Sequence, residues 1–429
     1  MTAAMQARIR PLAGAVLLVA MLIAVAAPPA RAGKNDKNGK AAPQATQPQI
    51  DTSLLVWPPK PEVARIKWEA LLAGEDDLKP TEKKKKKASW MDRMAGVTLP
   101  QESGKPRLMK PYGVATDSNG QVYVADAGLG LVFVFNLEEK KVTYRGNNVL
   151  QAPSGVAIDD ADRLFVADSQ QHAVFIFRPD GSVEGTIGQD RLVRPVGIAI
   201  DNENRYLYVV DAQANRVSVF DADSMKFLRA WGKLSDEMAA PGTFSAPTNV
   251  AVDSDGNVYV TDTFNARVQV FDAEGQFVTM WGKQGNSAGN FMRPKGVAVD
   301  SDDHIYVVDS EFNNVQVFDR NGRVLMFFGD RGEGPGLFTL ATGICVDKQN
   351  RIIVTEQWSG RMQVFRYVTD KEAAPEYQRL AKGEAEKAGT GKDQPKTDPG
   401  KNDDKPQPQA AAPVKDSVAA KAANPGAKQ

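Results

Sequence analysis

Four short apolar runs decide the fold of this chain: Arg293-Pro-Lys-Gly-Val-Ala-Val-Asp300, His304-Ile-Tyr-Val-Val-Asp309, Asn314-Val-Gln-Val-Phe318 and Gly322-Arg-Val-Leu-Met-Phe-Phe-Gly329. The runs are rich in β-branched and aromatic residues, and Asp, Asn and Gly occupy the positions between them. This pattern predicts four short antiparallel strands that follow one another through tight turns.

The same pattern recurs five more times. The other copies begin at Pro111-Tyr-Gly-Val-Ala115, Pro153-Ser-Gly-Val-Ala157, Pro195-Val-Gly-Ile-Ala199, Pro247-Thr-Asn-Val-Ala251 and Ala341-Thr-Gly-Ile-Cys345. Successive copies start roughly 40–50 residues apart, which is the period of propeller blades that contain four strands each. The repeats therefore predict an all-β protein, a six-bladed β-propeller.

The residue order within one copy resembles the NHL repeat. The segment Asp262-Thr-Phe-Asn-Ala-Arg-Val-Gln-Val-Phe271 matches its spacing best, and the resemblance covers residues 105–368. It implies an exported bacterial six-bladed β-propeller of NHL type. The family includes lyases, RNA-binding modules and protein-binding modules, so the resemblance implies no single activity.

The first residues have the features of a targeting segment. Residues 1–32 contain Arg8 and Arg10, then an apolar run and the sequence Ala30-Arg-Ala32, which is typical of a signal peptide and its cleavage site. We therefore expect an exported protein, periplasmic or extracellular, that does not span a membrane once the signal is removed. Residues 33–60 contain few apolar side chains, and we expect a disordered linker there.

The propeller is expected to cover residues 61–370, with the repeats in 105–370. In the segment from Arg65 to Leu72, apolar and charged residues alternate as in a half-buried strand. The sixth copy has no fourth strand after Phe365. Because an unpaired sheet edge promotes aggregation, we predict that the N-terminal strand completes the last blade and closes the ring.

Three further segments carry simple expectations. The run Lys83–Lys87 is typical of a solvated loop, and a docking patch for an acidic partner or an anionic lipid is the alternative. A short helix packed on the propeller is expected at residues 89–94, so that residues 61–104 hold strand, loop and helix. Residues 371–429 are rich in Lys, Asp, Pro, Ala and Gln and are expected to form a disordered tail.

Composition argues against several functions. The net charge is zero, so nothing favours nucleic acid as a partner. The chain has one cysteine and two histidines, His172 and His304, which lie at non-equivalent positions of different repeats. This argues against a His-rich zinc site, and no C-x-x-C or Walker motif occurs. We expect no catalytic residue, no cofactor and a monomer.

Acidic residues recur at two positions of each repeat. One set follows the first strand and the other follows the second: Asp117, Asp159, Asp201, Asp253, Asp300 and Asp347, and then Asp126, Asp168, Asp211, Asp262, Asp309 and Glu356. A residue that recurs in every blade favours a structural role, in which the carboxylate accepts backbone N–H groups of a turn. A single Ca²⁺ in the central channel is the metal hypothesis that this ring of acids leaves open.

The loops that join one repeat to the next vary from repeat to repeat. In an antiparallel blade they lie on the same face as the turns between second and third strands. Because loops on a rigid scaffold commonly carry binding residues, we predict a partner-binding face there. Its candidates are Phe264, Asn265, Arg267, Phe312, Asn313, Gln357 and Trp358. Ordinary turn chemistry is the alternative interpretation.

These observations favour a binding scaffold of the cell envelope. Its partner is expected to be a protein or a peptide, and a glycan is also compatible with the loops. The alternative is a propeller enzyme that depends on a divalent cation in the channel, of the lyase or lactonase/esterase type.

Overall fold

The computed structural model describes residues 51–79, 104–234 and 240–389, with side chains described up to residue 380. The expected signal peptide, the lysine run at 83–87 and the short helix at 89–94 lie outside these residues. Within the described ranges, no helix is long and apolar enough to cross a membrane.

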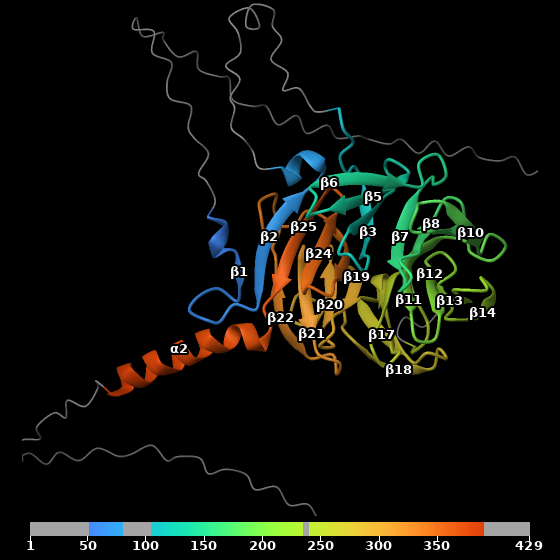
Figure 1. The fold of residues 1–429 in the computed structure, drawn as a ribbon. Coiled ribbons are helices and arrows are strands. Elements are labelled where there is room, and N and C mark those ends of the chain that lie inside the picture. The colour runs from blue at the N-terminus through green and yellow to red at the C-terminus, as the bar shows by residue number, and fades with distance from the viewer. Residues whose placement is uncertain (1–50, 80–103, 235–239, 390–429) are drawn as a thin grey trace, which may run out of the picture. The chain divides into compact units, whose positions relative to one another are not determined.

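Six antiparallel sheets form the blades of a propeller (Figure 1). Blade 1 contains β3 (Pro111–Thr116), β4 (Val122–Asp126), β5 (Leu131–Asn136) and β6 (Lys141–Arg145). Blade 2 contains β7 (Pro153–Ile158), β8 (Leu164–Asp168), β9 (Ala173–Phe177) and β10 (Val183–Ile187). Blade 3 contains β11 (Pro195–Asp201), β12 (Tyr206–Asp211), β13 (Arg216–Asp221) and β14 (Phe227–Trp231).

The other three blades follow the same order. Blade 4 contains β15 (Pro247–Val252), β16 (Val258–Asp262), the 3₁₀ turn η3 (Thr263–Asn265), β17 (Arg267–Phe271) and β18 (Phe277–Trp281). Blade 5 contains β19 (Pro294–Val299), β20 (Ile305–Asp309), β21 (Asn314–Phe318) and β22 (Val324–Phe328). Blade 6 contains β23 (Ala341–Val346), β24 (Arg351–Glu356) and β25 (Arg361–Tyr367), together with β2 (Ile66–Leu72) and the short β1 (Val56–Trp57).

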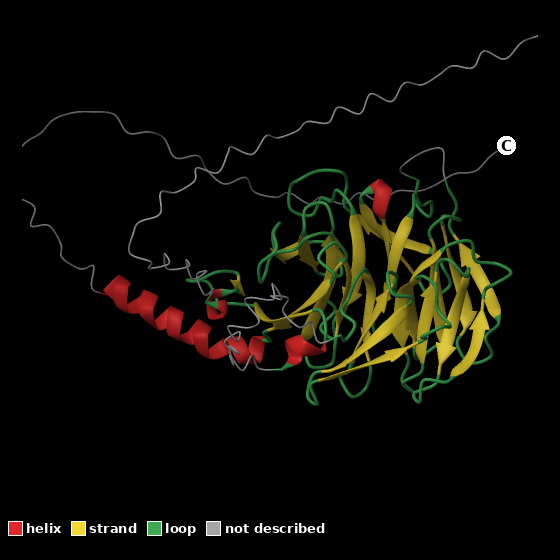
Figure 2. Ribbon diagram, turned by 90° about the horizontal axis from the view of Figure 1, so that it is seen from above, coloured by secondary structure: helices red, strands yellow, loops and turns green. Residues whose placement is uncertain are grey.

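Strands form the body of the propeller, and loops gather at the strand ends (Figure 2). In an antiparallel meander, the turns between second and third strands lie at the same end as the connections between blades. We call this end the loop face. The turns between first and second strands, and between third and fourth strands, lie at the other end, which we call the turn face.

The first strands of neighbouring blades approach closely around the propeller axis. A Cβ atom on Gly343 would lie 2.1 Å from the carbonyl oxygen of Tyr112, and one on Gly155 would lie 2.2 Å from that of Val196. Real Cβ atoms do not approach oxygen so closely. This packing explains the glycine of the P-x-G motif, which no local turn requires.

The last blade takes its fourth strand from the N-terminal part of the chain. β2 pairs antiparallel with β25 and places Trp68 opposite Phe365 and Leu72 opposite Met362. The role of this strand in closing the ring stays a prediction. Figure 1 shows β2, drawn in blue, beside the orange β25.

Because of a register shift in β2, the apolar side chains of this one strand contact blade 5 at its start and blade 1 at its end. The shift lies between Trp68 and Ala70. Ile66 and Trp68 pack in the cluster that includes residues of blade 5, whereas Ala70 and Leu72 pack in the cluster that includes residues of blade 1. A β-bulge inserts one residue and so exchanges the faces of the strand beyond it.

The structure corrects the boundaries expected for the linker and the tail. Residues 51–60 include η1 (Thr52–Leu54) and β1, and the ring of Trp57 contacts Phe328 and Phe365. A single buried aromatic ring can therefore fix a proline-rich segment against the propeller. Low average hydropathy of the segment does not exclude such packing.

The expectation of a disordered tail is wrong over Asp370–Gly389, which form the helix α2. Glu372 accepts the backbone N–H of Thr369, and its own N–H donates to the Thr369 hydroxyl, a capping box that the sequence Thr-x-x-Glu allows. Ala, Glu, Lys and Leu in this stretch also favour a helix. Ala373 is buried against Val63 and Val368.

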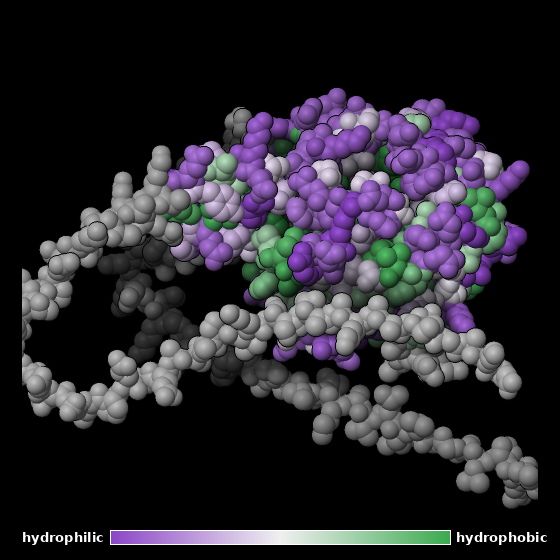
Figure 3. Space-filling view, turned by 90° about the horizontal axis from the view of Figure 1, so that it is seen from below, coloured by the Kyte–Doolittle hydropathy of each residue, from purple (hydrophilic) through white to green (hydrophobic). Residues whose placement is uncertain are grey.

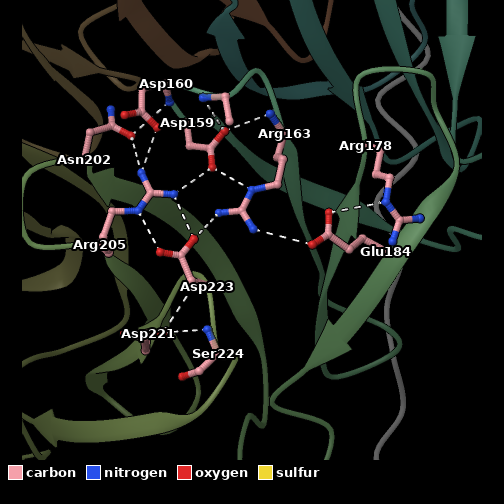
Figure 4. A network of polar contacts seen from close by, with 11 residues as sticks. Asp159, Asp160, Arg163, Arg178, Glu184, Asn202, Arg205, Asp221, Asp223 and Ser224 are labelled. Carbon is pink, nitrogen blue, oxygen red and sulfur yellow. Dashed lines mark hydrogen bonds and ion pairs between the residues drawn. The ribbon is translucent and has the colours of Figure 1, made fainter.

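Ion pairs join blades 2 and 3 on the turn face (Figure 4). Arg163 and Arg205 both contact the buried Asp159, at 2.7 and 3.1 Å, and both contact Asp223, at 2.7 and 3.0 Å. Hydrogen bonds from Arg205 and Arg163 hold the pKa of Asp223 below its ordinary value. Shared partners lower the entropic cost of each pair, and the network ties the two blades together.

His304 lies on the same face in blade 5. Its Nδ1 atom is 3.0 Å from Oδ2 of Asp300, and this hydrogen bond raises the pKa of His304 although burial opposes the shift. The equivalent residue of blade 4 is Asn257, whose amide Nδ2 donates to Asp253 at 2.9 Å. An asparagine in place of His304 can therefore make the same hydrogen bond to the aspartate, but it cannot supply the positive charge of a protonated histidine.

We expect the stability that His304 contributes to depend on pH. A folded-state pKa above the unfolded value of about 6.5 makes this contribution complete at lower pH and removes it as the pH rises through the folded pKa. The wild-type protein should therefore exceed the variant His304→Asn in melting temperature at about pH 6 and should lose this advantage by about pH 9. Thermal unfolding of both proteins at the two pH values measures the difference, and an equal difference at both would contradict the prediction.

Candidate ligand-binding face

The acids after the second strands hold the loop face together. Asp168 is fully buried, and its carboxylate accepts the backbone N–H groups of Gln151 at 2.6 Å, Ala152 at 3.1 Å, Gln170 at 3.1 Å and Gln171 at 3.0 Å. These donors belong to the connection between blades 1 and 2 and to the following turn. The structural interpretation of this acid is confirmed.

The acids after the first strands have a similar task on the turn face. Asp253 accepts the backbone N–H groups of Asp255 at 3.0 Å and Asn257 at 2.8 Å, and also the hydroxyl of Tyr259 at 2.9 Å. In the described ranges, no three His, Cys, Asp or Glu side chains come together as metal ligands. The Ca²⁺ hypothesis therefore gains no donor set from these acids.

Two of the predicted partner-binding residues are strongly exposed. Phe264 is 64% exposed in the turn of blade 4, and Trp358 is 78% exposed in the turn of blade 6. Large aromatic side chains seldom remain this accessible without a partner. Phe312, Asn265 and Gln357 are partly buried, and Gln357 donates its amide to the hydroxyl of Tyr112 at 2.7 Å.

Two other predicted residues do not belong to the exposed surface. Arg267 is buried, and its Nε donates to Asp262 at 2.8 Å. Asn313 is also buried, with its Oδ1 accepting the backbone N–H of Leu340 at 2.7 Å. Both side chains stabilise the loops of their own blades, which is the alternative that turn chemistry offered.

Further apolar side chains that sequence reasoning missed are exposed on the loop face. They come from the connections between blades and from the turn of blade 1: Met109, Leu129, Val193 and Leu234. Together with Phe264 and Trp358 they give this face six exposed large hydrophobic residues, and the turns of the opposite face carry none among the described residues. Other exposed apolar residues lie on outer strands such as β18 and β22, and Figure 3 shows apolar patches within hydrophilic surface on one side of the molecule.

Phe264 and Trp358 lie at the two ends of a row of side chains that spans three blades. The guanidinium of Arg293 lies 5.8 Å from the centre of the Phe264 ring, and its Nε is 3.6 Å from the Glu311 carboxylate. Glu311 and Trp358 line the same shallow depression between blades 5 and 6. We call Phe264, Arg293, Glu311 and Trp358 the aromatic strip.

A cavity of about 330 Å³ lies beside this strip around the propeller axis, and we call it the axial cavity. Its wall includes the residue that follows the first residue of each repeat: Tyr112, Ser154, Val196, Thr248, Lys295 and Thr342. Arg194, Arg293 and Phe264 also line it. The variable x of the P-x-G motif was the available sequence signal for this cavity, but the direction of these side chains was not apparent from the sequence.

Comparisons with known proteins agree with this fold. A family model described as a 6-bladed beta-propeller matches residues 145–233, 244–313 and 300–367. A solved structure of a structural genomics protein of unknown function from Bacteroides thetaiotaomicron is 18% identical, with 60% of this chain and 70% of that chain covered and a TM-score of 0.50. A search of the curated proteins found no match to this sequence.

Two further solved structures are more distant, and no functional argument rests on them. An auxiliary nutrient binding protein from Bacteroides thetaiotaomicron is 14% identical, with 61% of this chain and 70% of that chain covered and a TM-score of 0.49. Virginiamycin B lyase from Staphylococcus aureus is 15% identical, with 61% and 96% covered and a TM-score of 0.45. The strand order, the family model and the solved structure with a TM-score of 0.50 together identify the protein as a six-bladed β-propeller.

Proposed function

We propose that this propeller is a binding module of the cell envelope whose loop face binds a protein or a peptide. The observation that carries this proposal is the asymmetry between the two ends of the blades. Six exposed large apolar residues lie in the loops and turns of the loop face, whereas the described turns of the turn face carry none. Exposed apolar patches rimmed by polar groups are typical of interaction sites.

The aromatic strip has the composition of a binding hot spot. Trp, Tyr and Arg are enriched among residues that dominate interface energies, and Phe264 and Trp358 flank the charged pair of Arg293 and Glu311. A partner that covers both aromatic rings would also cover this pair. An extended peptide or a protein loop has the length to bridge three blades.

The envelope location and the NHL assignment are parts of this proposal. The signal-like features of residues 1–32 support export, and the spacing of Asp262 to Phe271 supports an NHL-type repeat. A divalent-cation-dependent enzyme is the other candidate. The axial cavity supports it less well, because Lys295, Arg194 and Arg293 line the cavity and no described Asp or Glu does.

Substitution of the two exposed rings tests the proposal. A partner is first isolated by co-purification from an envelope fraction and identified by mass spectrometry, and its affinity is then measured by calorimetry. Phe264→Ala and Trp358→Ala are each expected to weaken binding by about 30-fold, because each removes the large aromatic contact at one end of the strip.

Leu325→Ala is the matched control, since Leu325 is an exposed apolar residue of the outer strand β22 and not of the loop face. It should leave the affinity unchanged. Equal binding by wild type and by the double variant of Phe264 and Trp358 would place the partner elsewhere on the propeller and reject the proposed face.

A further inference from the structure

The axial cavity offers many hydrogen-bond donors and few acceptors. Lys295 contributes an ammonium group, and neither Lys295 nor Arg194 forms an ion pair with a side chain that the structure describes. The third cation, Arg293, is exposed and pairs with Glu311 at 3.6 Å. No described Asp or Glu lines the cavity.

Asn249 and Tyr112 add neutral donors to the same cavity. Asn249 stands where the other five repeats have glycine, and its Oδ1 accepts the backbone N–H of Val250 at 2.8 Å. Its Nδ2 group has no partner among the described residues. The hydroxyl oxygen of Tyr112 accepts a hydrogen bond from Gln357, so its own hydrogen remains free to donate.

The remaining polar groups of the wall are already satisfied by the protein. The hydroxyl of Thr248 lies 2.8 Å from that of Thr263 and 3.2 Å from the carbonyl oxygen of Lys295. Ser154 donates to carbonyl oxygens of its own and the next blade. These hydroxyls hold the first strands together, and the side-chain donors with no acceptor among the described residues are those of Lys295, Arg194, Asn249 and Tyr112.

We propose that the axial cavity binds the carboxylate group of an organic acid with a small apolar body. This inference goes beyond partner binding on the loop face and stands without it. A carboxylate offers acceptor oxygens only and therefore complements a wall of donors. The apolar body would contact the aliphatic part of the wall: Val114, Val156, Ile198, Val250, Val297 and Ile344.

Charge and volume favour a carboxylate over a phosphate. Lys295 is half-buried, whereas Arg194 and Arg293 are exposed at the rim and are screened by solvent. One half-buried cation neutralises one negative charge, and a phosphate monoester carries about 1.5–2 negative charges at neutral pH. A volume of about 330 Å³ is at the lower end of the range of small-molecule sites.

The environment of the Lys295 ammonium group agrees with a carboxylate site. Burial and the nearby Arg293 lower the pKa of Lys295 below its ordinary value. An ammonium group in such a place lacks the stabilisation that an anion would supply. Binding of a carboxylate would supply it.

Calorimetry on the purified protein tests this inference with 4-methylpentanoate as the probe. Its amide, 4-methylpentanamide, and inorganic phosphate are the chemical comparisons. A tripeptide ending in leucine, with a free or an amidated C-terminus, distinguishes a peptide end from a free acid as the source of the carboxylate. We expect saturable binding of 4-methylpentanoate or of the free-ended tripeptide, and no binding of either amide.

Lys295→Met should weaken the binding of the carboxylate by about tenfold or more, because it removes a charge-assisted hydrogen bond and keeps the aliphatic stem. Asn249→Gly, which restores the residue of the other repeats, should weaken it less. Lys110→Met is the matched control, because Lys110 precedes Pro111 as Arg293 precedes Pro294 but does not line the cavity. It should change nothing.

Folding of the variants is checked by their melting temperatures. Lys295→Met removes a half-buried charge that has no ion-pair partner and should not lower the melting temperature. The inference is rejected if no carboxylate probe binds at up to about 10 mM, well above the Kd of weak specific complexes. It is also rejected if the amide or phosphate binds as tightly, or if the Lys295→Met variant binds like the wild type.

Discussion

The double substitution Ile66→Asp and Trp68→Asp is expected to unfold the propeller or to make it aggregate. Ile66 is fully buried, and the indole Nε1 of Trp68 donates to the buried Gln363 at 2.8 Å. Each apolar side chain contributes roughly 1.5–3 kcal/mol by burial. The loss for both, increased by the cost of burying carboxylates, is comparable with the whole stability of a domain, about 5–15 kcal/mol.

The consequence reaches beyond β2 because of its place in the last blade. Without β2, β25 has an unpaired edge, and blades 5 and 1 lose the side chains that the register shift places against each of them. Size-exclusion chromatography and thermal unfolding measure the outcome. Lys67→Asp is the control, because Lys67 is exposed and stands opposite Arg366.

Lys67→Asp should leave the melting temperature nearly unchanged. A chain truncated to begin at Ala88 should behave like the double variant, because it also lacks β2. A truncated protein that stays monomeric with the wild-type melting temperature would show that the ring does not depend on β2. The closing role of this strand stays a prediction until that measurement.

Asp168→Ala is the second substitution with a large expected effect. It leaves four backbone N–H groups at the loop face without their acceptor, and each buried donor without a partner costs about 1–3 kcal/mol. Because water can reach some of these groups in a loop, we expect a total loss of about 3–5 kcal/mol. Urea unfolding measures this loss through the midpoint and the slope.

Asp160→Ala is the control for Asp168. Asp160 lies in the exposed turn of the same blade and forms a single ion pair with Arg205 at 2.8 Å. Its removal should cost less than about 1 kcal/mol. If Asp168→Ala were as stable as the wild type and lost a bound Ca²⁺, the acid would be a metal ligand and not a loop anchor.

The strand pattern could be predicted because it is local. Runs of β-branched and aromatic residues such as Ile305–Asp309, the turn residues between them and a regular period depend on nearby residues only. These features predict the strands of each repeat. The sequence also indicated that the last repeat lacks a fourth strand and that an isolated strand lies near Trp68. Each of these two features is incomplete without the other. The helix α2 was not predicted, because its polar, low-complexity composition is typical of disordered tails. The capping box at Thr369 and Glu372 was the local signal for it.

The exposure of the candidate binding residues was only partly predictable. Phe264 and Trp358 are exposed, as the sequence allowed, because aromatic residues in turns need not be buried. Arg267 has the same sequence context as an exposed turn residue, and only its contact with Asp262 shows that it is internal. The position of a side chain within a turn sequence does not show whether it points toward solvent or into the protein.

The sequence by itself determined the six repeats and their strands, because periodicity is encoded in short segments. Only the tertiary structure decided that Lys295, Asn249 and Tyr112 share one cavity, and that Ile66 and Leu72 contact different blades. The physical reason is that these neighbours come from different blades. They meet only when the ring of sheets closes around its axis, and no local pattern records that distance.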